Sequence, residues 1–154
     1  MDGLELEGRY RFGSGFEVIG NVSNQSNEND DNSQDVTYSP DLMVKTGVTY
    51  HSASGYRLSI FNSYFSASTL QNRENNPVLF TNSNADAYHL LTVNLQIDLA
   101  NFTKSLSLTD TTISFYVDNL LNEDIYFPSI NRRSVNSIPH HHGRGIYGTV
   151  THSL

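Results

Sequence analysis

The chain contains no cysteine and no tryptophan, and only 16% of its 154 residues are charged. Without cysteine it has neither a disulfide framework nor a thiolate metal site. No apolar run reaches the roughly 18 residues that a membrane-spanning helix needs, whereas spanning strands hide their hydrophobicity in alternation. The formal net charge is −7, and no cluster of lysine and arginine offsets it. This charge argues against nucleic acid or an anionic membrane surface as a partner.

The residues that are abundant belong to strands and turns. Hydrophobic residues make up 37% of the chain, with nine tyrosines and eight phenylalanines, and serine, threonine, asparagine and glycine supply much of the rest. Aromatic residues and threonine favour strands, while glycine, asparagine and serine favour turns. No segment has the periodicity of a long helix. The composition therefore predicts an all-β protein.

Apolar and polar residues alternate with a period of two along most of the chain. In residues 4–12, Leu4, Leu6 and Tyr10 alternate with Glu5, Glu7, Arg9 and Arg11. The same pattern predicts further strands over residues 16–22, 42–51, 56–66, about 90–99, about 113–117 and 143–154. The apolar stripe of residues 91–99 is the cleanest of the set.

Short and long connections alternate between these predicted strands. Residues 13–15 and 52–55 form tight turns. The polar segments 26–35, 69–86 and 122–143 form long loops, so every long loop lies at the same end of the sheet. Strands of about ten residues and loops of unequal length at the two ends are typical of outer-membrane barrels. We therefore predict an antiparallel up-and-down meander of about seven long strands, part of a larger transmembrane β-barrel.

A self-contained fold is the alternative. A small soluble β-barrel or sandwich, acting in ligand binding or adhesion, has the same period of two, but its apolar face is turned inward. The environment of Leu91, Val93, Leu95 and Ile97 discriminates between the two interpretations. These side chains fill a closed interior in a soluble protein and face outward in a membrane barrel.

A resemblance to a known family is visible near the end of the chain. The segment 116–126, Tyr-Val-Asp-Asn-Leu-Leu-Asn-Glu-Asp-Ile-Tyr, resembles the C-terminal barrel of TonB-dependent outer-membrane receptors, in which an Asn-Leu pair and an acidic turn end the penultimate strand. Residues 3–12, 132–139 and 143–147 resemble other parts of the same barrel. The family motif comprises Asp118, Asn119, Leu120, Arg144 and Gly145.

The resemblance implies a bacterial outer-membrane protein that takes up nutrients such as siderophores, cobalamin or glycans. Such receptors have a 22-stranded barrel and an N-terminal plug, and the inner-membrane TonB complex supplies the energy. Residues 1–154 correspond to the C-terminal portion of that barrel. The implied partners are outer-membrane lipid, the plug and barrel strands that this chain lacks, and the TonB complex through the plug. Residues 1–5 lack the basic start and the apolar core of an export signal, and we therefore expect the chain to be a fragment of a longer protein.

Several residues acquire expected positions from this comparison. We expect the lumen of the barrel to be lined by Glu5, Glu7, Arg9 and Arg11. There they either form ion pairs with one another and with the plug, or simply form a hydrated wall. Ile146, Val150 and Leu154 are expected to form the C-terminal assembly signal. Family members usually end in Phe, with an aromatic or apolar residue two positions earlier, whereas this chain has Leu154 and His152.

Candidate chemistry is sparse. His140, His141 and His142 invite a metal ion, but adjacent residues rarely converge and the spacing matches no standard zinc site, so a solvated loop is the preferred interpretation. Asp118 and Asn119 are interpreted as turn residues that satisfy backbone amides. The sequence has no Gly-x-Ser-x-Gly motif and no glycine-rich phosphate loop. We therefore predict no enzymatic activity and no cofactor.

Aromatic residues near predicted strand ends suit the membrane interface, where a ring can keep one edge wet. These predicted anchors are Tyr10, Phe16, Tyr50, Tyr56, Tyr64 and Tyr88.

Overall fold

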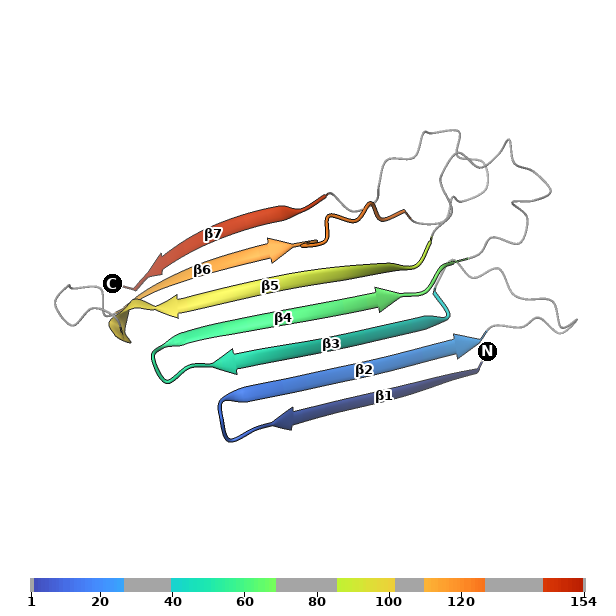
Figure 1. The fold of residues 1–154 in the computed structure, drawn as a ribbon, viewed down its shortest axis with the longest axis horizontal. Coiled ribbons are helices and arrows are strands. Elements are labelled where there is room, and N and C mark those ends of the chain that lie inside the picture. The colour runs from blue at the N-terminus through green and yellow to red at the C-terminus, as the bar shows by residue number, and fades with distance from the viewer. Residues whose placement is uncertain (1, 27–39, 69–85, 102–109, 127–142, 154) are drawn as a thin grey trace, which may run out of the picture.

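A computed structural model describes residues 2–26, 40–68, 86–101, 110–126 and 143–153. These residues form one sheet of seven strands and a short 3-10 helix, η2 (Leu99–Asn101) (Figure 1). The strands are β1 (Asp2–Arg11), β2 (Phe16–Ser26), β3 (Leu42–His51), β4 (Tyr56–Phe65), β5 (Tyr88–Asp98), β6 (Thr111–Asp118) and β7 (Gly145–His152).

The sheet has the simplest antiparallel topology. Its order is β1-β2-β3-β4-β5-β6-β7, so each strand pairs with its neighbours in the chain. The connections 12–15 and 52–55 lie at one end of the sheet, hereafter the turn end, and residues 27–41, 66–87 and 119–144 connect strands at the opposite loop end. The prediction of an antiparallel meander of about seven strands is confirmed. No helix in the described ranges is long and apolar enough to span a membrane.

Strand register divides the side chains between two faces, because residues paired across antiparallel strands point to the same side of a sheet. Tyr10, for example, pairs with Val18, which pairs with Val48 on β3. The apolar face comprises Leu4, Leu6, Tyr10, Phe16, Val18, Val22, Leu42, Val44, Val48, Tyr50, Tyr56, Leu58, Ile60, Tyr64, Leu91, Val93, Leu95, Ile97, Ile113, Phe115, Val117, Ile146 and Val150.

The opposite face carries most of the hydrogen-bonding and charged groups of the strands. This polar face comprises Glu5, Glu7, Arg9, Arg11, Glu17, Asn21, Ser23, Lys45, Thr49, His51, Arg57, Ser59, Ser63, Thr92, Asn94, Gln96, Asp98, Thr112, Ser114, Asp118, Thr149 and Thr151. The alternation in the sequence therefore becomes a separation of two continuous surfaces.

The two tight turns depend on glycine. Gly15 and Gly55 have φ angles of 87° and 85°, a left-handed conformation that glycine adopts without the penalty of a Cβ. Each turn also closes a backbone hydrogen bond, from Gly15 N–H to the carbonyl of Phe12 at 3.3 Å and from Gly55 N–H to the carbonyl of Ser52 at 3.2 Å. These turns set the register of β1 with β2 and of β3 with β4.

The sheet is a single layer with almost no interior. Within the described part of the chain, Ile125 is the one buried hydrophobic residue, whereas Leu4 is 75% exposed and Ile146 is 73% exposed. Strands contact only their neighbours in the sheet, and η2 contacts β6. The described residues therefore lack the enclosed core that a soluble sandwich needs.

Some details differ from the sequence-based expectations. β6 and β7 have eight residues each, fewer than the ten expected, and β2 continues to Ser26, into the predicted loop. Tyr88 lies on the polar face, where its ring stacks on Phe65 with centroids 4.9 Å apart. The alternation of β5 is the one expected, with odd-numbered residues on the apolar face, and the even-numbered Tyr88 therefore lies opposite the predicted lipid-facing anchors.

Aromatic rings gather on the apolar face near the turn end. Tyr10 and Phe12 have ring centroids 4.7 Å apart, Phe16 and Tyr50 4.6 Å, and Tyr50 and Tyr56 5.9 Å. At the loop end the ring of Tyr64 lies 4.9 Å from that of His89. These two groups bracket the aliphatic part of the face, as the aromatic girdles of membrane barrels do.

Close packing on the polar face leads to a first prediction. Gly47 is buried, and a Cβ there would collide with the ring of Phe61 and approach Cγ1 of Ile19 to 3.0 Å. Gly47→Val should therefore destabilise the protein by about 1–3 kcal/mol. A Cβ at Gly20 meets nothing within 4 Å, so Gly20→Val should change stability by less than about 0.5 kcal/mol. Urea titration in detergent micelles measures both, and equal effects would contradict the packing argument.

Candidate functional site

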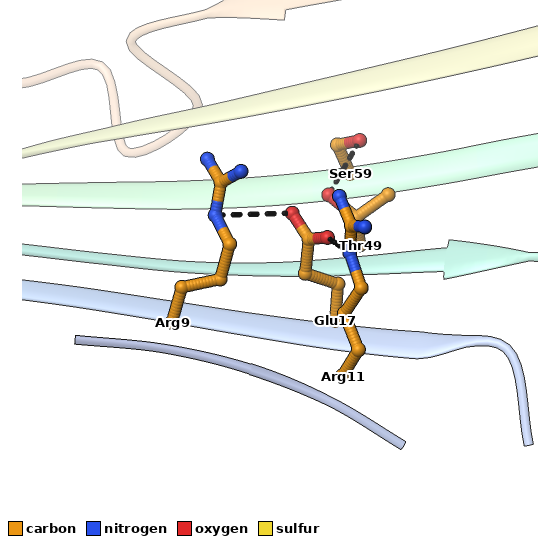
Figure 2. Close-up of polar contacts among 5 residues, drawn as sticks. All are labelled: Arg9, Arg11, Glu17, Thr49 and Ser59. Carbon is orange, nitrogen blue, oxygen red and sulfur yellow. Dashed lines mark hydrogen bonds and ion pairs between the residues drawn. The ribbon is translucent and has the colours of Figure 1, made fainter. Parts of the chain in front are cut away.

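The most strongly charged cluster on the polar face joins β1 to β2. Glu17 accepts a hydrogen bond from Nε of Arg11, and its other carboxylate oxygen lies 3.7 Å from Nε of Arg9 (Figure 2). The Glu17 side chain is 18% exposed, compared with 58% for Arg9 and 73% for Arg11. One shielded carboxylate therefore holds two solvent-accessible guanidinium groups.

The acidic residues predicted to share this surface lie elsewhere on it. Glu5 accepts a hydrogen bond of 2.8 Å from Nδ2 of Asn21, and Glu7 pairs with Asn21 across the strands. The ion pairs of Arg9 and Arg11 on β1 are therefore formed with Glu17 on β2. Sequence reasoning missed Glu17, although its position directly opposite Arg11 across the 12–15 turn follows from the length of that turn.

Hydrogen bonds between polar side chains continue this surface across β3, β4 and β5. Thr49 donates a hydrogen bond of 3.0 Å to Ser59 (Figure 2), and Arg57 donates to Oε1 of Gln96. Such cross-strand pairs stabilise a sheet and also offer hydroxyl and amide groups to the solvent side. The polar face is therefore suited to binding polar solutes or polar protein segments by hydrogen bonds.

The family motif forms a compact junction at the loop end of β6. Asn119 is fully buried and has a φ of 46°. Its side chain donates to the carbonyl of Glu123 at 2.8 Å and accepts from the N–H of Glu123 at 3.0 Å. This pair of bonds closes the turn after β6, as asparagine does where backbone groups lack strand partners.

The same junction ties β6 to its neighbours on both sides. Leu120 N–H donates to the carbonyl of Leu91 on β5 at 2.8 Å. Arg144, immediately before β7, donates from Nε to the carbonyl of Leu120 at 2.9 Å and from its backbone N–H to Oδ1 of Asn122 at 2.9 Å. Residues far apart in the sequence therefore meet where β5, β6 and β7 reach the loop end.

The structure places the other predicted residues as follows. Asp118 pairs with Gly145 at the first position of β7, which brings both into the junction with Asn119, Leu120 and Arg144. Ile146 and Val150 are exposed on the apolar face. His140, His141, His142 and Leu154 lie outside the described residues, and no group of metal-ligating side chains occurs among the residues that are described.

The junction generates a second prediction. Asn119→Ala removes both hydrogen bonds of the Asn119 side chain, so the backbone N–H and carbonyl of Glu123 lose these partners. We expect a loss of about 2–4 kcal/mol in the free energy of unfolding, because buried unpaired polar groups and an alanine at positive φ are both unfavourable. Leu121→Ala is the control, because Leu121 is half exposed in the same turn. Urea titration with circular dichroism compares them, and equal losses would show that Asn119 does not hold the turn.

Comparison with known proteins agrees with these features. No curated protein matches the chain. A family model described as TonB dependent receptor-like, beta-barrel matches residues 1–120, which include strands β1 to β6 in full. The match covers more than three quarters of the sequence, and the fold has the antiparallel strands of such a barrel. The chain belongs to the TonB-dependent receptor-like β-barrel family.

Proposed function

We propose that this chain forms part of the wall of an outer-membrane receptor that imports a scarce nutrient of the siderophore, cobalamin or glycan type. The apolar face contacts lipid, and the polar face lines a pore that a plug domain fills. The separation of these two faces on one open layer of strands is the observation that carries the proposal.

The exposure of the apolar face favours this proposal over a self-contained soluble protein. Leu91, Val93, Leu95 and Ile97 are half-buried by neighbouring side chains of the sheet, and none lies in an enclosed interior. Exposed apolar patches larger than a few hundred Å² mark interaction or membrane surfaces in soluble proteins. Here the patch extends over all seven strands, and hydrocarbon is the environment that matches it.

The strand lengths suit a membrane. β1, β3 and β4 each have ten residues, and ten residues rise about 34 Å at 3.4 Å per residue. Tilted by about 40°, such strands cross about 25 Å, which is the height of the apolar band of outer-membrane barrels. The aromatic groups near the two ends of the apolar face support the same orientation.

The direction of the strands indicates how the barrel closes. All odd-numbered strands run the same way, so β1 and β7 are parallel to each other. Antiparallel pairing at both edges therefore needs an odd number of additional strands. Two copies of this sheet related by rotation about the barrel axis could not close an antiparallel barrel, because β7 of one copy would lie parallel to β1 of the other. Large outer-membrane transporters have about 22 strands, and removal of seven leaves an odd remainder.

The remaining partners follow from this architecture. Further barrel strands pair with the edges β1 and β7, because unpaired backbone groups in hydrocarbon are unfavourable by several kcal/mol each. The plug contacts the polar face from inside, and the TonB complex acts on the receptor through the plug. Outer-membrane lipid surrounds the apolar face.

The orientation of the faces gives a third prediction. Val93 and Asn94 are neighbours on β5 and point to opposite faces. Val93→Arg places a charge against lipid and should therefore destabilise the protein, lowering its free energy of unfolding in lipid vesicles by about 2–4 kcal/mol. Asn94→Arg leaves the charge in the aqueous pore and should change it by less than about 1 kcal/mol. A larger loss for Asn94→Arg would reverse the assignment of the two faces.

The fourth prediction concerns nutrient uptake by living cells. The full receptor that carries this segment is expressed in a bacterium that lacks other uptake systems for ferric siderophores, cobalamin and oligosaccharides. We expect uptake of one of these labelled classes, and its loss when the TonB complex is deleted. A receptor that is folded in the outer membrane yet takes up none of the three classes would contradict the proposed function.

A further inference from the structure

The arginine pair on the polar face has the geometry of an anion-binding site. Glu17 contacts both Arg9 and Arg11 through their Nε atoms. Figure 2 shows the two side chains extending from β1 in the same direction, with the terminal Nη ends directed away from the bond to Glu17. The carboxylate therefore orders both guanidinium groups while it leaves their terminal ends accessible.

A count of hydrogen-bond donors strengthens this interpretation. Each guanidinium carries five N–H donors in a planar fork; Glu17 accepts the Nε–H of Arg11 and lies 3.7 Å from Nε of Arg9. Four terminal donors of each arginine thus remain available to an acceptor on the open side. Forked N–H groups match the oxygens of a carboxylate or a phosphate better than an ammonium does, because they bind two oxygens at once.

The local charge points to the same class of ligand. Arg9 and Arg11 contribute two positive charges and Glu17 one negative charge, so the cluster is a net cation. Glu5 and Glu7 lie on the same strand but closer to the loop end, and Glu5 is bonded to Asn21. Arg57 on β4 and Asp98 on β5 lie on the same face near the turn end. Arginines thus outnumber carboxylates in this part of the face, and the excess of positive charge is centred on Arg9 and Arg11.

We propose that Arg9 and Arg11, ordered by Glu17, bind a carboxylate or phosphate group on the polar face of the sheet. This inference rests on the proposed function in one respect, since that face lines the pore. Two sources supply such a group: an acidic side chain of the plug, or an anionic solute that passes through the pore. In either case Glu17 is a positioning residue, and the two arginines make the contacts.

Phosphate binding tests the proposal and is the fifth prediction. The full receptor that carries this segment is purified in detergent and titrated with inorganic phosphate by calorimetry at low ionic strength, because salt screens exposed charges. The Arg9→Gln/Arg11→Gln variant should bind phosphate at least tenfold more weakly than the unmodified receptor. Arg9→Lys/Arg11→Lys keeps the charges without the forks and should recover only part of the affinity.

Lys45→Gln is the matched control, because it removes one positive charge from the same face of β3 at a position outside the pair. It should change phosphate affinity by less than twofold. A loss as large as that of Arg9→Gln/Arg11→Gln would overturn the proposal, since diffuse charge would then explain binding. Affinity of the lysine variant equal to that of the unmodified receptor would overturn it as well.

A conductance measurement identifies the source of the anion. If a plug carboxylate occupies the pair, the unmodified receptor binds no added phosphate. In that case Arg9→Gln/Arg11→Gln should loosen the plug and raise the conductance of the receptor in a planar bilayer, while Lys45→Gln should not. Absence of phosphate binding together with unchanged conductance overturns the proposal. Both readouts are independent of nutrient uptake, so a receptor that transports none of the tested nutrients still gives a clear result here.

Discussion

The pairing of backbone hydrogen bonds between adjacent strands is the constraint on which this structure depends. With Ile125 as the one buried hydrophobic residue in the described ranges, the strands gain little from a packed interior. Their order follows instead from continuous antiparallel pairing between β1 and β7. In hydrocarbon such pairing is obligatory, because no water replaces a missing partner. In the proposed barrel, β1 and β7 are therefore the two strands that further strands must pair with.

The two faces of the sheet meet different requirements. In the proposed barrel the apolar face contacts lipid, which makes no specific demand on the shapes of aliphatic residues such as Leu6, Val48 and Ile60. The polar face carries specific contacts between Glu17 and two arginines and between Thr49 and Ser59. Selective interactions with other molecules are therefore expected on the polar face, and under the proposed function the apolar face mainly fixes the position of the sheet in the membrane.

Much of the fold could be predicted from the sequence because a period of two assigns each residue to a face without knowledge of its partners. The strand from Leu4 to Arg11 and the turns at Gly15 and Gly55 are examples. Features that depend on register were less accessible. Glu17 became a candidate only when its position opposite Arg11 was known, and the stacking of Tyr88 on Phe65 depended on which residues of β4 and β5 are paired.

The motif at the end of β6 illustrates a further limit. The sequence indicated that Asp118 and Asn119 are turn residues, and hydrogen bonds from Asn119 to Glu123 agree with that interpretation. The involvement of Arg144 in the motif rested on resemblance alone, because residues 127–142 separate it from the turn. Its bond to the carbonyl of Leu120 could be found only from the three-dimensional arrangement.

This bond has a consequence for the last strand. Side-chain contacts join β7 to β6 at two positions, where the ring of Tyr147 lies 6.0 Å from that of Tyr116 and His152 is hydrogen-bonded to Thr111 at 2.8 Å. A slip of one residue would move Ile146 and Val150 from the apolar face to the polar face. The bonds of Arg144 add a third contact immediately before β7, where its side chain and backbone bind the turn that follows β6. A slip would break all three contacts, so the junction favours the register that keeps the terminal apolar residues on the apolar face. Asn119 contributes by closing the turn to which Arg144 binds.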